Sequence, residues 1–191
     1  MKYRERSPFF VYLRLAKYDL DDVDRLVNWS EQQRQARQNE LERIRLDEER
    51  VVDEVAEIDG FARLYAECAI VALWRCVELF GKRVIGQALG PAKAKKAYRR
   101  DDFCKMLGQL KISEAGLRCA KSLNELRLLN NAVKHDGHIE ERLAELPRWK
   151  RRAGEEIGDL RSHYHRLRPL AERYIDDLTG KATKWWKSKP A

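Results

Sequence analysis

The chain has 191 residues, of which 37% are charged, and a net charge of +8, but only ten glycines and five prolines. This length suits one domain that is large enough to bury a core. Apolar residues that recur every three or four positions predict an all-α protein, and no apolar run is long enough to span a membrane. Arg14 and Lys17 interrupt the apolar start of the chain, so we expect no signal peptide and a cytoplasmic location.

The first third of the chain predicts helices that end in a charged arm. Residues 9–29 favour one helix or a helix pair, and residues 30–59 are rich in Glu, Gln and Arg. The second stretch predicts a solvated helix with one apolar face, and a coiled-coil arm is the alternative. Its apolar positions form a thin stripe: Leu41, Ile44, Val51, Val55 and Ile58.

The middle of the chain predicts a core helix and a break. Residues 61–89 are apolar on most sides, which predicts a helix packed between others. Gly90 and Pro91 end this helix and begin the next, which we expect over residues 92–110 with an interruption at Asp101. Ser113 is the expected N-cap of the helix that follows.

The last part of the chain predicts a short amphipathic segment over residues 139–146 and a long helix over 153–178. We expect the tail, residues 181–191, to be loosely ordered unless Trp185 and Trp186 dock. The predicted architecture is an antiparallel bundle of about five helices with a long charged N-terminal helical arm. The arm and N-terminal helices cover 1–59, the bundle 60–180 and the basic tail 181–191.

The cysteines give no sign of a metal site. Cys68, Cys76, Cys104 and Cys119 show no CxxC spacing, and no histidine lies near them in the sequence. Buried, reduced thiols are the simplest interpretation. We expect no metal ion and no cofactor.

Residues 124–137, NELRLLNNAVKHDG, are the most informative stretch of the chain. Arg127, Asn131 and His135 are four residues apart, so a helix places them on one stripe. Asn131 lies one turn from both of the others and could orient either by hydrogen bonding. Gly137 is suited to the left-handed position beyond the helix end. The stripe predicts a polar seam, either in an active site or at a protein interface.

This segment resembles the Arg-to-His motif of the HEPN superfamily, helical-bundle proteins of bacterial toxin–antitoxin and phage-defence systems. It also resembles an NNxxKHxxG signature of bacterial proteins that we group near that superfamily. The interval between Arg127 and His135, seven residues, is longer than is usual in the family, and Leu128 takes a place that is usually polar.

The resemblance implies a ribonuclease that cuts RNA without a metal ion, with two motifs facing each other in a homodimer. His135 would be the general acid or base, Arg127 would contact phosphate, and Asn131 would complete the catalytic set. Asn130, Lys134 and His138 are the candidate substrate-binding residues, although Lys134 is more simply a solvated cation and His138 a loop residue. An antitoxin or another defence protein would be a further partner, and no membrane is implied.

Two other interpretations stay open. The first is a non-enzymatic helical interaction or dimerisation protein, in which the Arg127–Asn131–His135 seam is structural or binds a partner or a nucleotide. The second is an adaptor that uses residues 30–59 as a coiled coil. Catalysis requires an accessible seam beside a basic groove, whereas a structural seam is buried and saturated with intramolecular bonds. Basic clusters at 93–100 and 148–152 permit binding to nucleic acid but do not establish it.

Overall fold

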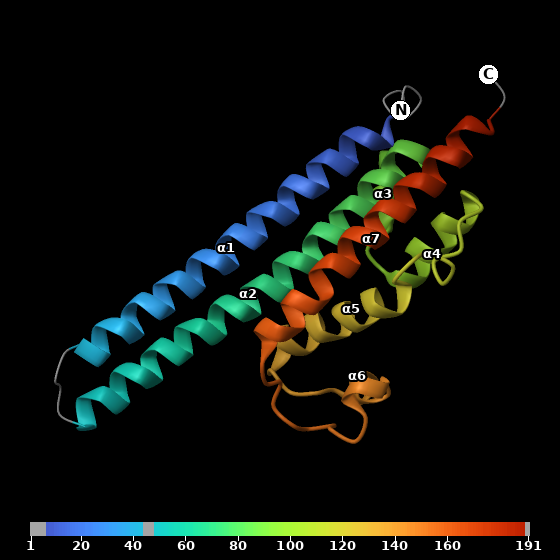
Figure 1. Ribbon diagram of the computed structural model, residues 1–191. Helices are drawn as coiled ribbons and strands as arrows, with labels where there is room; N and C mark the ends of the chain where they lie inside the picture. Colours follow the sequence, from blue (N-terminus) through green and yellow to red (C-terminus); the bar gives the residue numbers. More distant parts are fainter. Residues whose placement is uncertain (1–6, 44–47, 190–191) are drawn as a thin grey trace.

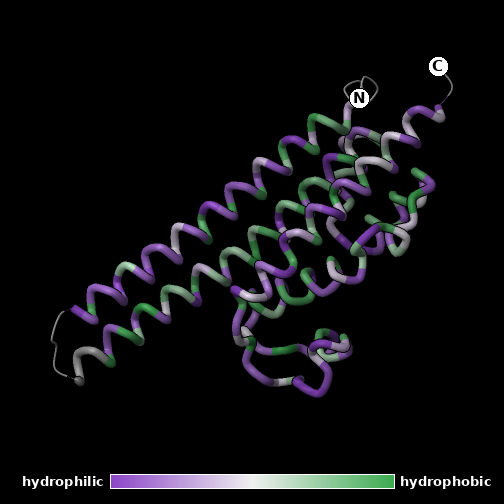
Figure 2. Tube along the Cα trace, viewed as in Figure 1, coloured by the Kyte–Doolittle hydropathy of each residue, from purple (hydrophilic) through white to green (hydrophobic). Residues whose placement is uncertain are grey.

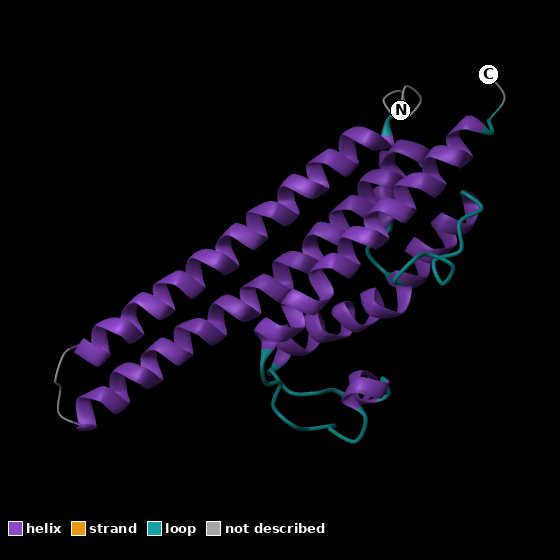
Figure 3. Ribbon diagram, viewed as in Figure 1, coloured by secondary structure: helices purple, strands orange, loops and turns teal. Residues whose placement is uncertain are grey.

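The computed structural model describes residues 7–43 and 48–189, with the side chains of residues 48–51 left out. These residues form an all-α bundle that contains no strand, as Figure 3 shows. Its one β-type feature in the described residues is an isolated bridge between His138 and Glu156. The fold class predicted from the sequence is therefore confirmed.

Two long helices, α1 (Phe9–Arg43) and α2 (Glu48–Leu89), run side by side in opposite directions (Figure 1). Three contacts fix their register along the pair. Arg83 pairs with Asp19 at 3.3 Å, Trp29 meets Tyr65 edge to face with ring centroids 5.7 Å apart, and Arg37 pairs with Glu54 at 2.7 Å.

The charged arm is the far end of this helix pair, not one solvated helix. Residues 30–43 belong to α1 and residues 48–59 to α2. Leu41 and Ile58 are buried, whereas Val55 is exposed. Ile44 and the side chain of Val51 lie outside the described part of the chain. Polar residues cover much of both helices here (Figure 2), and of the predicted apolar stripe the structure shows only Leu41 and Ile58 to be buried.

The closing helix, α7 (Leu160–Lys187), packs on α1 and α2 and completes the main core. Asp159 caps its start by accepting a hydrogen bond from the Ser162 amide at 3.2 Å, so the helix begins seven residues later than predicted. It also continues past Leu178, because the Trp186 ring docks edge to face on buried Phe9, with centroids 6.2 Å apart. The tail is thus helical to Lys187.

Four shorter helical elements and a 3-10 turn cover one side of α2 and α7 or lie beyond it. Gly90, at φ 95°, separates α2 from α3 (Pro91–Lys96). The helix predicted over residues 92–110 is divided by a break at residues 97–99, after which α4 (Arg100–Gln109) begins.

Helix α5 (Ala120–His135) carries the stripe of Arg127, Asn131 and His135. It starts after Cys119, not at Ser113, whose carbonyl instead accepts from Gly116 in a turn. Helix α6 (Glu141–Ala144) and the 3-10 turn η1 (Pro147–Trp149) follow.

The cysteine prediction is only partly correct. Cys76 is buried in the core, Cys104 and Cys119 are partly buried, and Cys68 is exposed. Burial raises the pKa of the Cys76 thiol to about 11. None of the described helices combines the length and apolar character that crossing a bilayer requires.

Candidate functional site: the pocket beside helix α5

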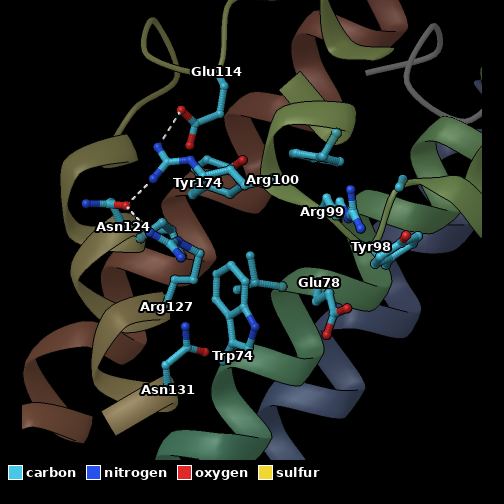
Figure 4. Close-up of a pocket in the computed structure, with 14 residues that line it drawn as sticks. Trp74, Glu78, Tyr98, Arg99, Arg100, Glu114, Asn124, Arg127, Asn131 and Tyr174 are labelled. Carbon is cyan, nitrogen blue, oxygen red and sulfur yellow. Dashed lines mark hydrogen bonds and ion pairs between the residues drawn. The ribbon is translucent and has the colours of Figure 1, made fainter. Parts of the chain in front are cut away.

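Helix α5 divides its residues between the core and a pocket. Leu126, Leu129 and Ala132 are fully buried against the bundle. Asn124, Arg127 and Asn131, at spacings of three and four, lie together on the face toward the pocket (Figure 4). Gly137 ends the helix as predicted, with φ 74°, and its amide donates to the Ala132 carbonyl at 3.0 Å.

The pocket lies between α2, α5 and the segment that joins α3 to α4, and it has a volume of about 220 Å³. Its lining combines aromatic rings with charged and amide side chains. The polar and aromatic lining residues are Trp74, Glu78, Tyr98, Arg99, Arg100, Phe103, Glu114, Asn124, Arg127, Asn131 and Tyr174.

Asn124 holds two guanidinium groups at one side of this pocket. Its Oδ1 accepts a hydrogen bond from Nη2 of Arg127 at 3.1 Å and another from Nη1 of Arg100. Nη2 of Arg100 lies 3.2 Å from Oε2 of Glu114, which forms the one ion pair of this group (Figure 4). Two cations therefore share a neutral amide, and only Arg100 is matched by a carboxylate.

Arg127 is the less satisfied of the two arginines. Among the described residues it forms no ion pair, and its Nε is buried without a hydrogen-bond partner. Burial, and then the positive charges of Arg100 and Arg142, lower the pKa of Arg127. Glu78, the other acid of the pocket, is already engaged by Lys82 at 2.5 Å and Arg75 at 3.4 Å. The pocket therefore has an excess of positive charge around Arg127.

The two adjacent asparagines of the motif occupy different environments. Asn130 is only 2% exposed, and its Nδ2 donates to Oδ1 of Asn131 at 3.2 Å. The Oδ1 of Asn130 is buried and has no partner among the described residues. Asn131 is half-buried and lines the pocket next to Arg127. The two asparagines are thus hydrogen-bonded to each other, but Asn130 faces the bundle interior and Asn131 faces the pocket.

His135 lies at the end of α5, eight positions beyond Arg127, which is about 12 Å along a helix axis. It is exposed, has no hydrogen-bond partner in the described part of the chain, and is not among the residues that line the pocket. Lys134 is exposed beside it. His138 is exposed in the following loop, where Nδ1 lies 3.0 Å from the Asp136 carbonyl oxygen. The structure brings Arg127 and Asn131 together and leaves the two histidines outside.

Several pocket residues were not singled out as site residues from the sequence. Asn124 stands three residues before Arg127 on the same helix, a spacing that could have marked it. Arg99 and Arg100 were visible as part of a basic cluster, but their placement beside Arg127 depends on the break between α3 and α4. Trp74 and Tyr98 carried no separate signal.

The described residues contain no group of three or more His, Cys, Asp or Glu side chains placed to hold a metal ion. Comparisons with protein-family models, with curated proteins and with solved structures find no match to this chain.

Proposed function

We propose that this protein is a HEPN-like ribonuclease of a bacterial phage-defence or toxin–antitoxin system, acting in the cytoplasm without a metal ion. Arg127 binds an RNA phosphate, and His135 transfers a proton. Histidine titrates near neutral pH, so it can act as acid or base. Arginine forms planar, two-pronged contacts with phosphate.

The observation that carries this proposal is the unsatisfied state of the seam. Arg127 lacks an acidic partner and His135 is exposed without a hydrogen bond, as far as the described residues go. A purely structural seam would be buried, with its polar atoms paired, because an unpaired buried polar group costs about 1–3 kcal/mol. RNA cleavage needs a cation that stabilises the phosphate charge and an imidazole that transfers a proton, and both must be free to contact the substrate.

The separation of Arg127 and His135 bears on how such a site is assembled. In one chain, α5 carries one exposed histidine, His135, and one arginine that lines the pocket, Arg127, about 12 Å away along the helix. The proposal therefore includes a homodimer, in which a two-fold axis combines groups of both copies. Size-exclusion chromatography with light scattering measures this directly, and the mass of two chains is expected.

The test of activity is incubation of the purified full-length protein with total RNA in EDTA. We expect the wild type to degrade RNA and His135→Ala to do so at least about 100-fold more slowly, the usual contribution of a general acid or base. His165→Ala is the matched control, because His165 is exposed on α7. Intact RNA in all samples, or equal degradation by wild type and His135→Ala, rejects the ribonuclease proposal.

A second candidate is a non-enzymatic interaction or dimerisation protein with the same fold. It is favoured by large apolar side chains that stay exposed on the long helix pair, including Trp29, Phe61 and Leu64. Phe61 and Leu64 are three residues apart on α2, so they lie on one face. This candidate predicts that Phe61→Ser with Leu64→Ser changes the oligomeric mass while RNA stays intact with every variant.

A further inference from the structure

The excess positive charge of the chain is concentrated at one end of the bundle. Helix α1 begins there, α2 leads into α3 there, and α7 ends there (Figure 1). Side-chain contacts hold these segments together. The Trp186 ring of α7 docks on Phe9 of α1, and the Tyr12 hydroxyl of α1 donates to Oε1 of Gln87 in α2 at 3.1 Å.

We call residues 7–18, 82–96 and 181–189 the basic end. These segments contain eleven lysine and arginine residues and no aspartate or glutamate. Because the whole chain has a formal net charge of only +8, the rest of the chain is net negative. The basic end is therefore the part that makes the protein basic.

Most of the cations at the basic end have no acidic partner. Acids from outside the basic end pair with four of them: Lys17, Lys82, Arg83 and Lys181. Six others are exposed and form no ion pair among the described residues: Arg14, Lys93, Lys95, Lys96, Lys184 and Lys189. Like charges that are gathered without counter-charges repel one another, so this surface favours an anionic partner.

Apolar side chains are exposed among these cations. Val11 is 61% exposed and Leu15 is 42% exposed, and their spacing of four places them on one face of α1, with Arg14 beside them. Trp186 is 39% exposed although its ring rests on Phe9. Proteins that bind to the surface of a bilayer combine basic residues with tryptophan and aliphatic side chains in this way.

The composition of the basic end favours a lipid surface over a nucleic acid. Five of the six exposed cations without an ion pair are lysines, whereas arginine is the residue that forms two-pronged contacts in nucleic-acid recognition. The exposed aliphatic side chains of Val11 and Leu15 gain nothing from a phosphate backbone. At a bilayer interface they are removed from water.

We propose that the basic end docks on an anionic phospholipid surface. The lysines of α3 and of the end of α7 supply the charge, and Val11, Leu15 and Trp186 enter the interface. The cytoplasmic leaflet carries anionic lipids and is a surface of this kind. This inference does not rest on the proposed function, because Arg127 and His135 lie outside the basic end.

The test is co-sedimentation of the full-length protein with phospholipid vesicles. We expect vesicles with one quarter phosphatidylglycerol to bind at least tenfold more tightly than vesicles of phosphatidylcholine alone, because each lysine near an anionic surface adds to the attraction. The triple variant Lys93→Gln, Lys95→Gln and Lys96→Gln should weaken this binding at least tenfold. High salt should weaken it as well, since salt screens exposed charges.

A matched control removes the same charge from another place. Arg148→Gln, Lys150→Gln and Arg151→Gln neutralise three exposed cations outside the basic end. Attraction to a charged surface falls off within a Debye length, so vesicle binding by this variant should stay within about twofold of the wild type.

A further variant tests the apolar contribution. Val11→Ser with Leu15→Ser keeps the net charge and changes only exposed side chains. We expect at least fivefold weaker binding to the phosphatidylglycerol vesicles. Circular dichroism and thermal unfolding establish that each variant is folded, so a loss of binding reports on the surface.

Four results overturn the inference. One is that the wild type binds neither kind of vesicle. Another is that the two triple variants lose binding equally, which would make the attraction a matter of net charge. A third is that the Val11→Ser, Leu15→Ser variant binds vesicles like the wild type. The last is that the Lys93, Lys95 and Lys96 changes weaken binding of a short RNA as strongly as binding of vesicles, which would assign this surface to nucleic acid.

Discussion

Trp149 and Glu125 form a buried hydrogen bond of 2.8 Å between the indole Nε1 and the carboxylate Oε1. Trp149 is completely buried, and both Oε atoms of Glu125 also accept from Arg166 of α7, at 2.6 and 3.1 Å. His163 stacks on the indole at a centroid distance of 4.5 Å. The segment between α5 and α7 is thereby attached to both helices at one point.

Removing the carboxylate should destabilise the whole bundle. Glu125→Ala leaves the indole N–H and the Arg166 guanidinium without their acceptor, and breaking a buried ion pair from one side costs about 3–5 kcal/mol. Because Arg166 keeps some contact with solvent, we expect about 3 kcal/mol in urea unfolding. Glu145→Ala is the control, since Glu145 is exposed and forms no ion pair among the described residues. Equal stability of the two variants would contradict this role of Glu125.

The same cluster predicts a dependence of stability on pH. Burial first, and then the charges of Arg166 and Arg148, lower the pKa of His163 below its ordinary value of 6.5, although Glu125 and Asp159 act in the opposite direction. The unfolded chain then binds the proton more readily than the folded one. Stability is therefore complete above about pH 6.5 and falls as the pH drops toward the lowered pKa, with a slope of at most about 1.4 kcal/mol per pH unit.

The measurement is the free energy of unfolding between pH 7.5 and 5.5 for the wild type and His163→Gln. Over this interval we expect the wild type to lose more stability than the variant, because only the wild type can protonate this ring. His165→Gln, an exposed histidine on the same helix, should behave like the wild type. A steeper loss in His163→Gln than in the wild type would show that the sign is wrong.

Cysteine reactivity gives an independent check of burial on α2. Cys68 is exposed, whereas Cys76 is buried and has a pKa of about 11, so very little of its reactive thiolate exists at pH 8. Iodoacetamide should alkylate Cys68 at least tenfold faster than Cys76 in the folded protein, as measured by peptide mass spectrometry. In 6 M guanidinium the difference should disappear, and a difference that survives would point to local sequence effects instead.

Local sequence signals predicted the fold more fully than the site. The end of α5 at Gly137 was predictable because glycine adopts the left-handed conformation readily, without contacts from distant parts of the chain. The start of α5 could not be predicted in this way. The Ser113 carbonyl accepts a hydrogen bond from the Gly116 amide in a turn, and Cys119, at φ 60°, is the N-cap residue of α5. The turn at Ser113 and the N-cap at Cys119 both depend on the packing of the surrounding chain.

Long-range partners explain what the sequence left open at the site. Arg127 could be recognised as a polar residue in an apolar helix, but its neighbour Arg100 is 27 positions away and reaches it only through the α3–α4 break. The docking of Trp186 on Phe9, at the other end of the chain, likewise needs the bundle to be assembled. Spacing within one helix carries no information about such pairs.

The end of α5 supplies the last prediction. Gly137 has φ 74°, and a Cβ added there would lie 3.2 Å from Nη2 of Arg63. Gly137→Ala should therefore cost about 1–2 kcal/mol of stability, the usual price of a left-handed conformation for an L-residue, plus any displacement of Arg63. Gly158→Ala is a matched control in the same loop region, because a Cβ there meets nothing within 4 Å and its φ is not in the left-handed range. We expect that control to change stability by less than about 0.5 kcal/mol. Thermal and urea unfolding of the two variants test this directly. A Gly137→Ala protein that is as stable as Gly158→Ala would mean that the backbone at this helix end relaxes freely. The position of His135, two residues earlier, would then not be fixed by the helix end.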